Sequence, residues 1–298
     1  MIRASTAITV LAALTATCLQ AAPALAQMAH VPDSDWRQPD RHDALIRASK
    51  PANFTIEARF GPFLPNIDAY VPVPKSGIPA TPFADVFGLD CSASPARYTG
   101  SVKPSFLGGL EVDYTPLRIP YVGAIGVGVG WSYSSFSNQA LITNSKPLQC
   151  SGENTTLTIM PMHASIVLRA DELMRRTGVP IVPYGKLGVG VAWWRSANDL
   201  GTEKVCGTPP SALTPCSGGA DQTAIASGTG LTPGLHFALG AALALNFLEP
   251  QSAARLDQTT GVHHAYLFGE YYNDTVALVQ NVMHVGAQSW VGGLAVDF

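Results

Sequence analysis

The sequence predicts an all-β fold, an eight-stranded antiparallel up-and-down transmembrane β-barrel with long extracellular loops and short periplasmic turns. Residues 289–298 alternate, with Trp290, Leu294, Val296 and Phe298 on one face, which is the two-residue period of a strand with unlike faces. Seven earlier segments alternate in the same way. No segment after the first 26 residues is apolar enough for a spanning helix, so we expect strands to cross the membrane.

The first 26 residues have the form of a secretory signal peptide. Arg3 gives the positive start, an apolar run follows, and Ala24-Leu25-Ala26 is a small-x-small cleavage site. We expect residues 1–26 to be removed. Residues 27–52 are polar, contain prolines and show no period, which predicts a flexible periplasmic segment. Residues 53–298 then form the barrel domain.

The composition is typical of an exported barrel. Only 13% of residues are charged and 28 are glycine, respectively below and above ordinary usage. The net charge of -3 and the lack of a Lys/Arg cluster argue against nucleic acid as a partner. One of the five cysteines lies in the signal peptide, and the remaining even number suits disulfides in an oxidising compartment.

The first four predicted strands span residues 54–60, 106–114, 121–136 and 157–169. Each places apolar side chains at alternate positions and smaller or polar ones between them. The apolar positions are Phe54, Ile56, Ala58 and Phe60; Phe106, Leu110, Val112 and Tyr114; Ile125, Val127, Val129, Trp131 and Tyr133; and Met160, Met162, Ala164, Ile166 and Leu168.

The last four predicted strands span residues 182–194, 235–247, 263–272 and 289–298. Residues 263–272 separate their faces poorly, because Tyr266 and Phe268 oppose the apolar set. The apolar positions before the terminal strand are Leu187, Val189, Val191 and Trp193; Leu235, Phe237, Leu239, Leu243, Leu245 and Phe247; and Ala265, Leu267 and Tyr271.

The residue types on the second face of these strands indicate whether the apolar face points outward or into the barrel. It is mostly Gly, Ala and Ser, which suit the crowded interior of a narrow barrel, whereas a soluble barrel would expose Lys, Glu, Thr and Gln. We therefore expect the apolar face to meet lipid. The second face also carries every charge within the strands: Glu57, Arg59, Glu111, Asp113, Arg169, Lys186 and Glu270. Unpaired buried charges are costly, so we expect a paired network across the lumen, with Lys186 and Arg59 each within reach of a carboxylate.

The connections provide an independent test. With a periplasmic amino terminus, the outward loops are 61–105, 137–156, 195–234 and 273–288. The shorter inward turns are 115–120, 170–181 and 248–262, the last two with helical turns. This asymmetry is typical of outer-membrane barrels.

All four remaining cysteines fall in the outward loops. Cys206 and Cys216 bracket a segment containing Pro and Gly, so we expect them to pair with each other. That leaves Cys91 with Cys150, although four cysteines allow three connectivities.

From Phe54 onward the sequence resembles a family of outer-membrane β-barrel proteins typical of myxobacteria and related Gram-negative bacteria. The matching pieces are Arg59–Asp68, Pro82–Gly88, Val182–Gly188, Phe247–Pro250, Ala254–Asp257, His264–Tyr272 and the terminal strand. The resemblance implies a barrel in the cell outer membrane. The family has no assigned activity, so the resemblance implies no catalytic residues.

Two groups of residues suggest chemistry at first sight. His163 and Ser165 share a strand face, as in some outer-membrane lipid deacylases, but the predicted phase turns them inward, away from lipid. His263 and His264 point to opposite faces, so at most one joins Glu270, which is too few ligands for zinc. We expect no catalytic, cofactor or metal site.

The sequence therefore predicts a non-enzymatic envelope or surface protein with a side-chain-filled lumen. Two alternatives stay open, a narrow channel for small solutes and a lipid-modifying enzyme. The expected partners are outer-membrane lipid and the outer-membrane assembly machinery, for which Phe298 is the assembly signal. The expected state is a monomer without cofactors. The sequence identifies no ligand, solute or partner for the loops.

Overall fold

The computed structural model describes residues 53–70, 81–142, 147, 149–206, 214–215, 224–275 and 283–298. These residues belong to one compact unit, Arg41–Phe298. The predicted signal peptide, the predicted periplasmic segment and Cys216 lie outside the described residues.

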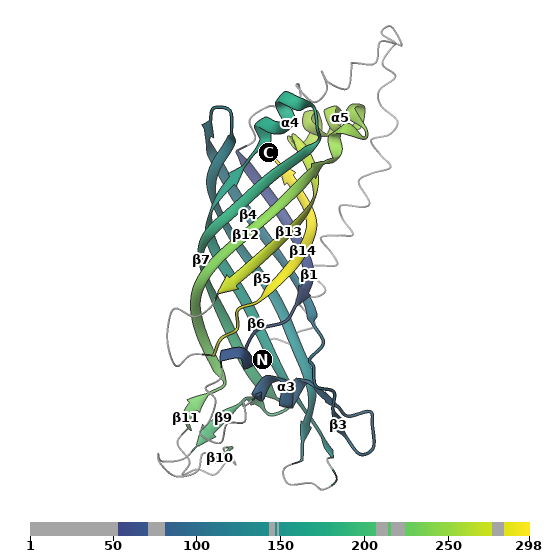
Figure 1. Cartoon of the computed structure of the whole chain (residues 1–298), viewed down its shortest axis with the longest axis vertical. Coiled ribbons are helices and arrows are strands. Elements are labelled where there is room, and N and C mark those ends of the chain that lie inside the picture. Colours follow the sequence, from purple (N-terminus) through teal and green to yellow (C-terminus); the bar gives the residue numbers. More distant parts are fainter. Residues whose placement is uncertain are drawn as a thin grey trace. The chain divides into compact units, whose positions relative to one another are not determined.

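Eight antiparallel strands close into a ring, which confirms the predicted fold class (Figure 1). Each strand pairs with the next along the chain, and the last pairs with the first. In order around the ring they are β1 (Phe54–Phe63), β4 (Ser105–Ile119), β5 (Gly123–Leu141), β6 (Cys150–Arg169), β7 (Ile181–Asn198), β12 (Thr229–Ala244), β13 (His264–Thr275) and β14 (Gln288–Asp297).

The closing seam joins β1 to β14. Its register runs from Thr55 opposite Asp297 to Phe60 opposite Gly292. Beyond the last strand residue, the Phe298 N–H donates to the Phe54 carbonyl oxygen at 2.8 Å. The final residue therefore takes part in closing the ring.

The two ends of the barrel carry different small elements. One end, here the loop end, carries η1 (Asp68–Tyr70), α3 (Pro82–Phe87), β2 (Leu89–Asp90), β3 (Arg97–Tyr98), β8 (Gly201–Thr202), β9 (Lys204–Cys206), β10 (Thr214–Pro215) and β11 (Ala224–Ser227). The other, the helix end, carries α4 (Asp171–Thr177), η2 (Leu245–Phe247) and α5 (Pro250–Thr260), near the carboxyl terminus (Figure 1).

The two predicted helical turns are α4 and α5. Gly178 and Gly261 follow them with φ of 71° and 74°, the left-handed conformation that commonly ends a helix at glycine. Among the described helices, none is both long and apolar enough to cross a membrane.

The strands extend farther at the loop end than the alternation predicts. β5 continues past residue 136 to Leu141, β6 begins at Cys150, and β12 begins at Thr229. The added residues are largely polar on both faces, so they show no amphipathic period, yet their backbones remain paired, as at Gln139 and Asn154. Residues 245–247, predicted to end a strand, form η2 instead.

The predicted orientation of the strand faces is confirmed. Val129 and Leu187 are 63% and 62% exposed, whereas the interior positions of the same strands are largely covered. Outward aromatic rings pair across strands near both ends: Phe54 with Tyr114 (4.7 Å), Phe60 with Phe106 (6.0 Å) and Tyr271 with Trp290 (5.3 Å). An apolar band flanked by aromatic rings is the exterior of a transmembrane barrel.

The burial pattern of β13 explains why the sequence of this strand does not show a clear apolar and a clear polar face. Its inward face carries buried rings, among them Tyr266 and Phe268, while Leu267 points outward. The Phe268 ring fits because the neighbouring inward position is a glycine: a Cβ on Gly293 would lie 3.0 Å from that ring. The inward Tyr184 ring of β7 fits in the same way, because a Cβ on Gly240 would lie 2.5 Å from it.

Candidate functional site

The lumen is filled by a cluster of charges from four strands. Lys186 of β7 lies 2.8 Å from Glu57, 3.0 Å from Glu111 and 3.3 Å from Glu270. Arg59 of β1 lies 2.7 Å from Glu111 and 2.6 Å from Glu270. All five side chains are buried. Each base thus bridges carboxylates from different strands, as expected for charges that share a narrow, poorly hydrated space.

A second cluster adjoins the first on the side of the helix end. Arg169 of β6 donates to Glu57 at 2.8 Å, to the Thr55 hydroxyl at 2.8 Å and to Asp297 at 3.1 Å. Thr55 in turn donates to Asp297 at 2.6 Å. Glu57 joins the two clusters, because its second oxygen contacts Lys186. All seven charged residues predicted for the lumen are brought together, with Asp113 3.6 Å from Arg169.

Two stacked imidazoles extend the network toward the loop end. The rings of His163 and His236 are 3.8 Å apart and nearly parallel. His163 lies 3.3 Å from Glu111, and His236 Nδ1 lies 2.6 Å from Asp274. Gly130 leaves room for the stack, because a Cβ there would lie 2.2 Å from the His163 ring.

Carboxyl groups outnumber bases in this network. Among the buried charges of the described strands, Glu57, Glu111, Asp113, Glu270 and Asp297 face Arg59, Arg169 and Lys186. Neither carboxyl oxygen of Asp113 accepts a hydrogen bond among the described residues. Each base therefore compensates more than one carboxylate, so we expect the loss of a base to be more damaging than the loss of Asp113.

Apolar side chains occupy the lumen at the loop end. The buried members of this plug are Phe63, Ile67, Phe83, Leu107, Phe136, Leu157, Ile159, Ala192, Ala238, Tyr272, Val285, Ala287 and Val291. Phe83 and Phe87 of α3 pack against the Phe136 ring of β5, with ring centroids 5.2 and 6.0 Å away. The described part of the first long loop, residues 81–104, therefore packs over this end of the barrel as a lid.

Polar contacts hold the lid, residues 81–104, in place. The Asp68 carboxylate accepts the backbone N–H groups of Phe83 and Ala84 at 2.8 and 2.9 Å. The Asn138 amide donates to the carbonyls of Val86 and Leu89 at 2.9 Å each. These contacts satisfy partly buried backbone groups of the lid.

A disulfide ties the lid to the barrel wall. Cys91 is bonded to Cys150 at the start of β6, with their Cα atoms 5.8 Å apart, the pairing that the sequence predicts. Cys206 lies in β9, but its expected partner Cys216 lies outside the described residues.

Replacing Cys91 with serine should loosen the lid while the ring stays folded. The bond closes a loop with a sequence separation of 59, which chain-entropy arguments value at about 4 kcal/mol. We expect trypsin to cut after the exposed Arg97 about tenfold faster or more. The matched control is Ala93→Ser, which keeps the disulfide. Equal cleavage of the two variants would show that the bond does not hold the lid.

The structure confirms the prediction that the His163 and Ser165 side chains point into the barrel. Both are buried in the lumen, so neither meets lipid on the outer face. His263 contacts Asp257 at 2.6 Å at the helix end. His163, Ser165 and His263 therefore do not place a nucleophile and a base side by side on the lipid-facing surface.

One trio among the described residues has ligand oxygens close enough for a metal ion, Glu57, Glu111 and Asp113. The Lys186 ammonium lies within 3.0 Å of two of them, and Arg169 contacts Glu57 and Asp113. These cations already provide the positive charge that a metal would bring, so the trio is better described as part of the ion-pair network.

Four further members of the network were not predicted from the sequence: Thr55, His236, Asp274 and Asp297. Thr55, His236 and Asp297 lie on the inward face of their strands in the same alternation that identified the others. Extending the charged set to every polar residue on that face would have found these three. Asp274 lies beyond the predicted end of its strand, so the alternation carried no signal for it.

Comparisons with known proteins find only distant likenesses. No protein-family model and no curated protein matches the chain. Ail, the attachment invasion locus protein of Yersinia pestis, in complex with the heparin analogue sucrose octasulfate, matches with a TM-score of 0.35 and 10% identity, over 83% of this chain and 97% of that one. The N-terminal β-barrel domain of Pseudomonas aeruginosa OprF matches with a TM-score of 0.30 and 9% identity, over 84% and 100%. The fold assignment rests on the closed strand pairing itself.

Proposed function

We propose that this chain is an integral outer-membrane β-barrel protein without enzymatic activity, whose closed lumen makes it an envelope or surface protein. The observation that carries the proposal is the filling of the lumen. A salt-bridged layer lies across its middle and an apolar plug lies above that layer at the loop end. Eight strands leave only enough interior for side chains.

The lid supports an outward role for the loop end. Long connections, the α3 segment and the Cys91–Cys150 disulfide all lie at this end, whereas the helix end has a short turn and two short helices. Outer-membrane barrels have long extracellular loops and short periplasmic turns. On this placement a disulfide-braced surface faces the outside, and α4 and α5 face the periplasm. We propose a monomer surrounded by outer-membrane lipid.

Planar-bilayer recording tests the closed lumen. We expect the purified wild-type barrel to show no steady current, because ion-paired and apolar side chains occupy the lumen. A porin recorded in the same bilayer shows that the membrane reports open pores. Steady, ion-selective conductance from the intact protein would contradict the proposal and favour the channel alternative.

Lipid analysis tests the absence of enzymatic activity. Cells with and without the protein should contain the same outer-membrane lipids, because His163 and Ser165 are enclosed in the lumen. A lipid that loses an acyl chain only in the presence of the protein, and not of its Ser165→Ala variant, would contradict the non-enzymatic assignment.

A further inference from the structure

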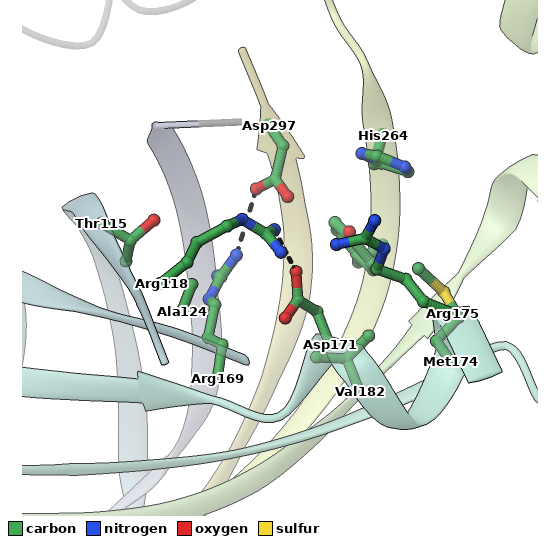
Figure 2. A pocket seen from close by; sticks show the side chains of 11 residues that line it. Thr115, Arg118, Ala124, Arg169, Asp171, Met174, Arg175, Val182, His264 and Asp297 are labelled. Carbon is green, nitrogen blue, oxygen red and sulfur yellow. Dashed lines mark hydrogen bonds and ion pairs between the residues drawn. The ribbon is translucent and has the colours of Figure 1, made fainter. Parts of the chain in front are cut away.

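A small polar pocket opens at the helix end, between α4 and the adjoining ends of the strands (Figure 2). Its volume is about 30 Å³, which admits one or two oxygen atoms of a larger group whose remainder lies outside the pocket. The charged or titratable residues that line it are Arg118, Arg169, Arg175, Asp171, Asp297, His264 and Tyr266. None of these residues was assigned to a ligand from the sequence, and the ion-pair network uses only Arg169 and Asp297.

The pocket is lined by three arginines and two aspartates. Asp297 is paired with Arg169 at 3.1 Å, and Asp171 is paired with Arg118. Arg169 is already shared with the lumen network. Arg175 lies 3.6 Å from Glu172, which does not line the pocket and also contacts Arg176 at 3.0 Å. Arg175 is therefore the lining cation whose charge is least compensated, and a nearby anion would compensate it.

His264 is the strongest sign that the pocket takes a ligand. Its side chain is 4% exposed, and neither ring nitrogen has a hydrogen-bond partner among the described residues. A neutral imidazole carries one N–H donor and one acceptor, and burying both without partners is costly. The imidazole therefore needs a hydrogen-bond partner that the lining side chains do not provide.

The two outer arginines have donors to spare. Arg118 contacts Asp171 through one terminal nitrogen, and a guanidinium has five N–H donors. Arg175 lies 3.6 Å from Glu172, which is too long for a hydrogen bond. In Figure 2 the guanidinium groups of Arg118 and Arg175 approach the pocket from opposite sides, with His264 beside them.

The remaining polar atom specifies the ligand further. The Oδ1 atom of Asp171 is buried without a hydrogen-bond partner, so it needs a donor. A ligand that satisfies the whole pocket must offer anionic oxygens to Arg175, Arg118 and His264 and a hydroxyl or N–H to Asp171. A singly charged phosphate group with an adjacent donor meets both requirements.

We propose that this pocket binds a monoanionic phosphate group that carries a hydrogen-bond donor, either free dihydrogen phosphate or the headgroup of an anionic phospholipid. Arg175 and Arg118 hold the anionic oxygens, His264 contacts one of them, and Asp171 accepts from the donor. Planar guanidinium groups are well suited to phosphate oxygens. The proposal is independent of whether the lumen conducts.

Phosphorus NMR of the purified, folded chain in a phosphate-free maltoside detergent tests it. One arm adds inorganic phosphate and the other adds dihexanoyl phosphatidylglycerol. We expect saturable broadening of the phosphorus signal in at least one arm. Broadening by inorganic phosphate identifies a free anion as sufficient, and broadening by the lipid alone identifies the headgroup. Silence in both arms at millimolar concentrations would overturn the proposal.

The variants separate this pocket from general surface charge. Arg175→Gln and His264→Gln should each weaken binding about tenfold or more, since a charge-assisted hydrogen bond is lost. Arg176→Gln is the matched control. Arg176 is the next residue of α4, contacts the same Glu172 at 3.0 Å, lies over the Tyr121 ring at 4.5 Å and does not line the pocket.

Arg175 is 38% exposed, so its replacement leaves the barrel folded, which heat-modifiable migration on gels verifies for each variant. Arg176→Gln should bind like the wild type. If Arg175→Gln binds as well as Arg176→Gln, the phosphate lies elsewhere and the assignment is wrong.

Discussion

Lys186→Met is expected to lower the free energy of unfolding by about 3–5 kcal/mol, the usual cost of removing one partner of a buried ion pair. Methionine keeps nearly the length of the lysine side chain but removes the charge that faces Glu57, Glu111 and Glu270. Arg59 alone would then compensate Glu111 and Glu270. The three carboxylates would lie close together with too little positive charge.

Denaturant unfolding in lipid vesicles, followed by tryptophan fluorescence, measures this loss. Asp113→Asn is the matched control, because Asp113 is also buried but accepts no hydrogen bond among the described residues. Removing this charge reduces the excess of carboxylates, so we expect a change much smaller than that of Lys186→Met, or a gain in stability. Equal losses from the two variants would show that stability does not depend on the pairing.

Deletion of Phe298 is expected to remove most of the assembled protein from the outer membrane. The Phe298 N–H donates to Phe54, and its carbonyl oxygen accepts from Asn53 at 3.1 Å. Each such bond contributes about 0.5–1.5 kcal/mol. Deletion would also place the terminal carboxylate on Asp297, which already carries a charge contacting Arg169.

Membrane fractionation with heat-modifiable gel migration measures assembly. Phe298→Tyr keeps the backbone bonds and an aromatic ring, so it should assemble like the wild type. Phe298→Ala keeps only the backbone bonds and therefore separates their contribution from that of the ring, which is 38% exposed. Normal amounts of the truncated protein in the outer membrane would contradict the role assigned to this residue.

The interior and exterior of the barrel could be predicted because alternation is a local property. Val129 points outward and Glu111 inward because successive side chains of a strand alternate between its faces, and the sequence shows this alternation directly. Strand ends could not be predicted in this way. The ends of β5 and β6, where Gln139 pairs with Asn154, carry polar residues on both faces, so they show no alternation although their backbones are paired.

The sequence also could not predict which charged residues in the lumen pair with each other. Arg169 meets Asp297, 128 residues away, and that contact depends on the ring closing in one register. The lid depends likewise on the distant contact of Phe83 with Phe136. Residue types therefore predicted that charges would pair, and only the fold determined which charges do.

The placement of the lumen charges along the chain has a consequence for how the barrel forms. Arg169 and Lys186 lie on the middle strands β6 and β7, while most of their carboxylate partners lie near the two ends of the chain, on β1, β13 and β14. A partly inserted sheet that lacks either end leaves these charges uncompensated within the membrane. Incomplete intermediates are therefore disfavoured, and insertion of the last strand should be cooperative with formation of the whole ring.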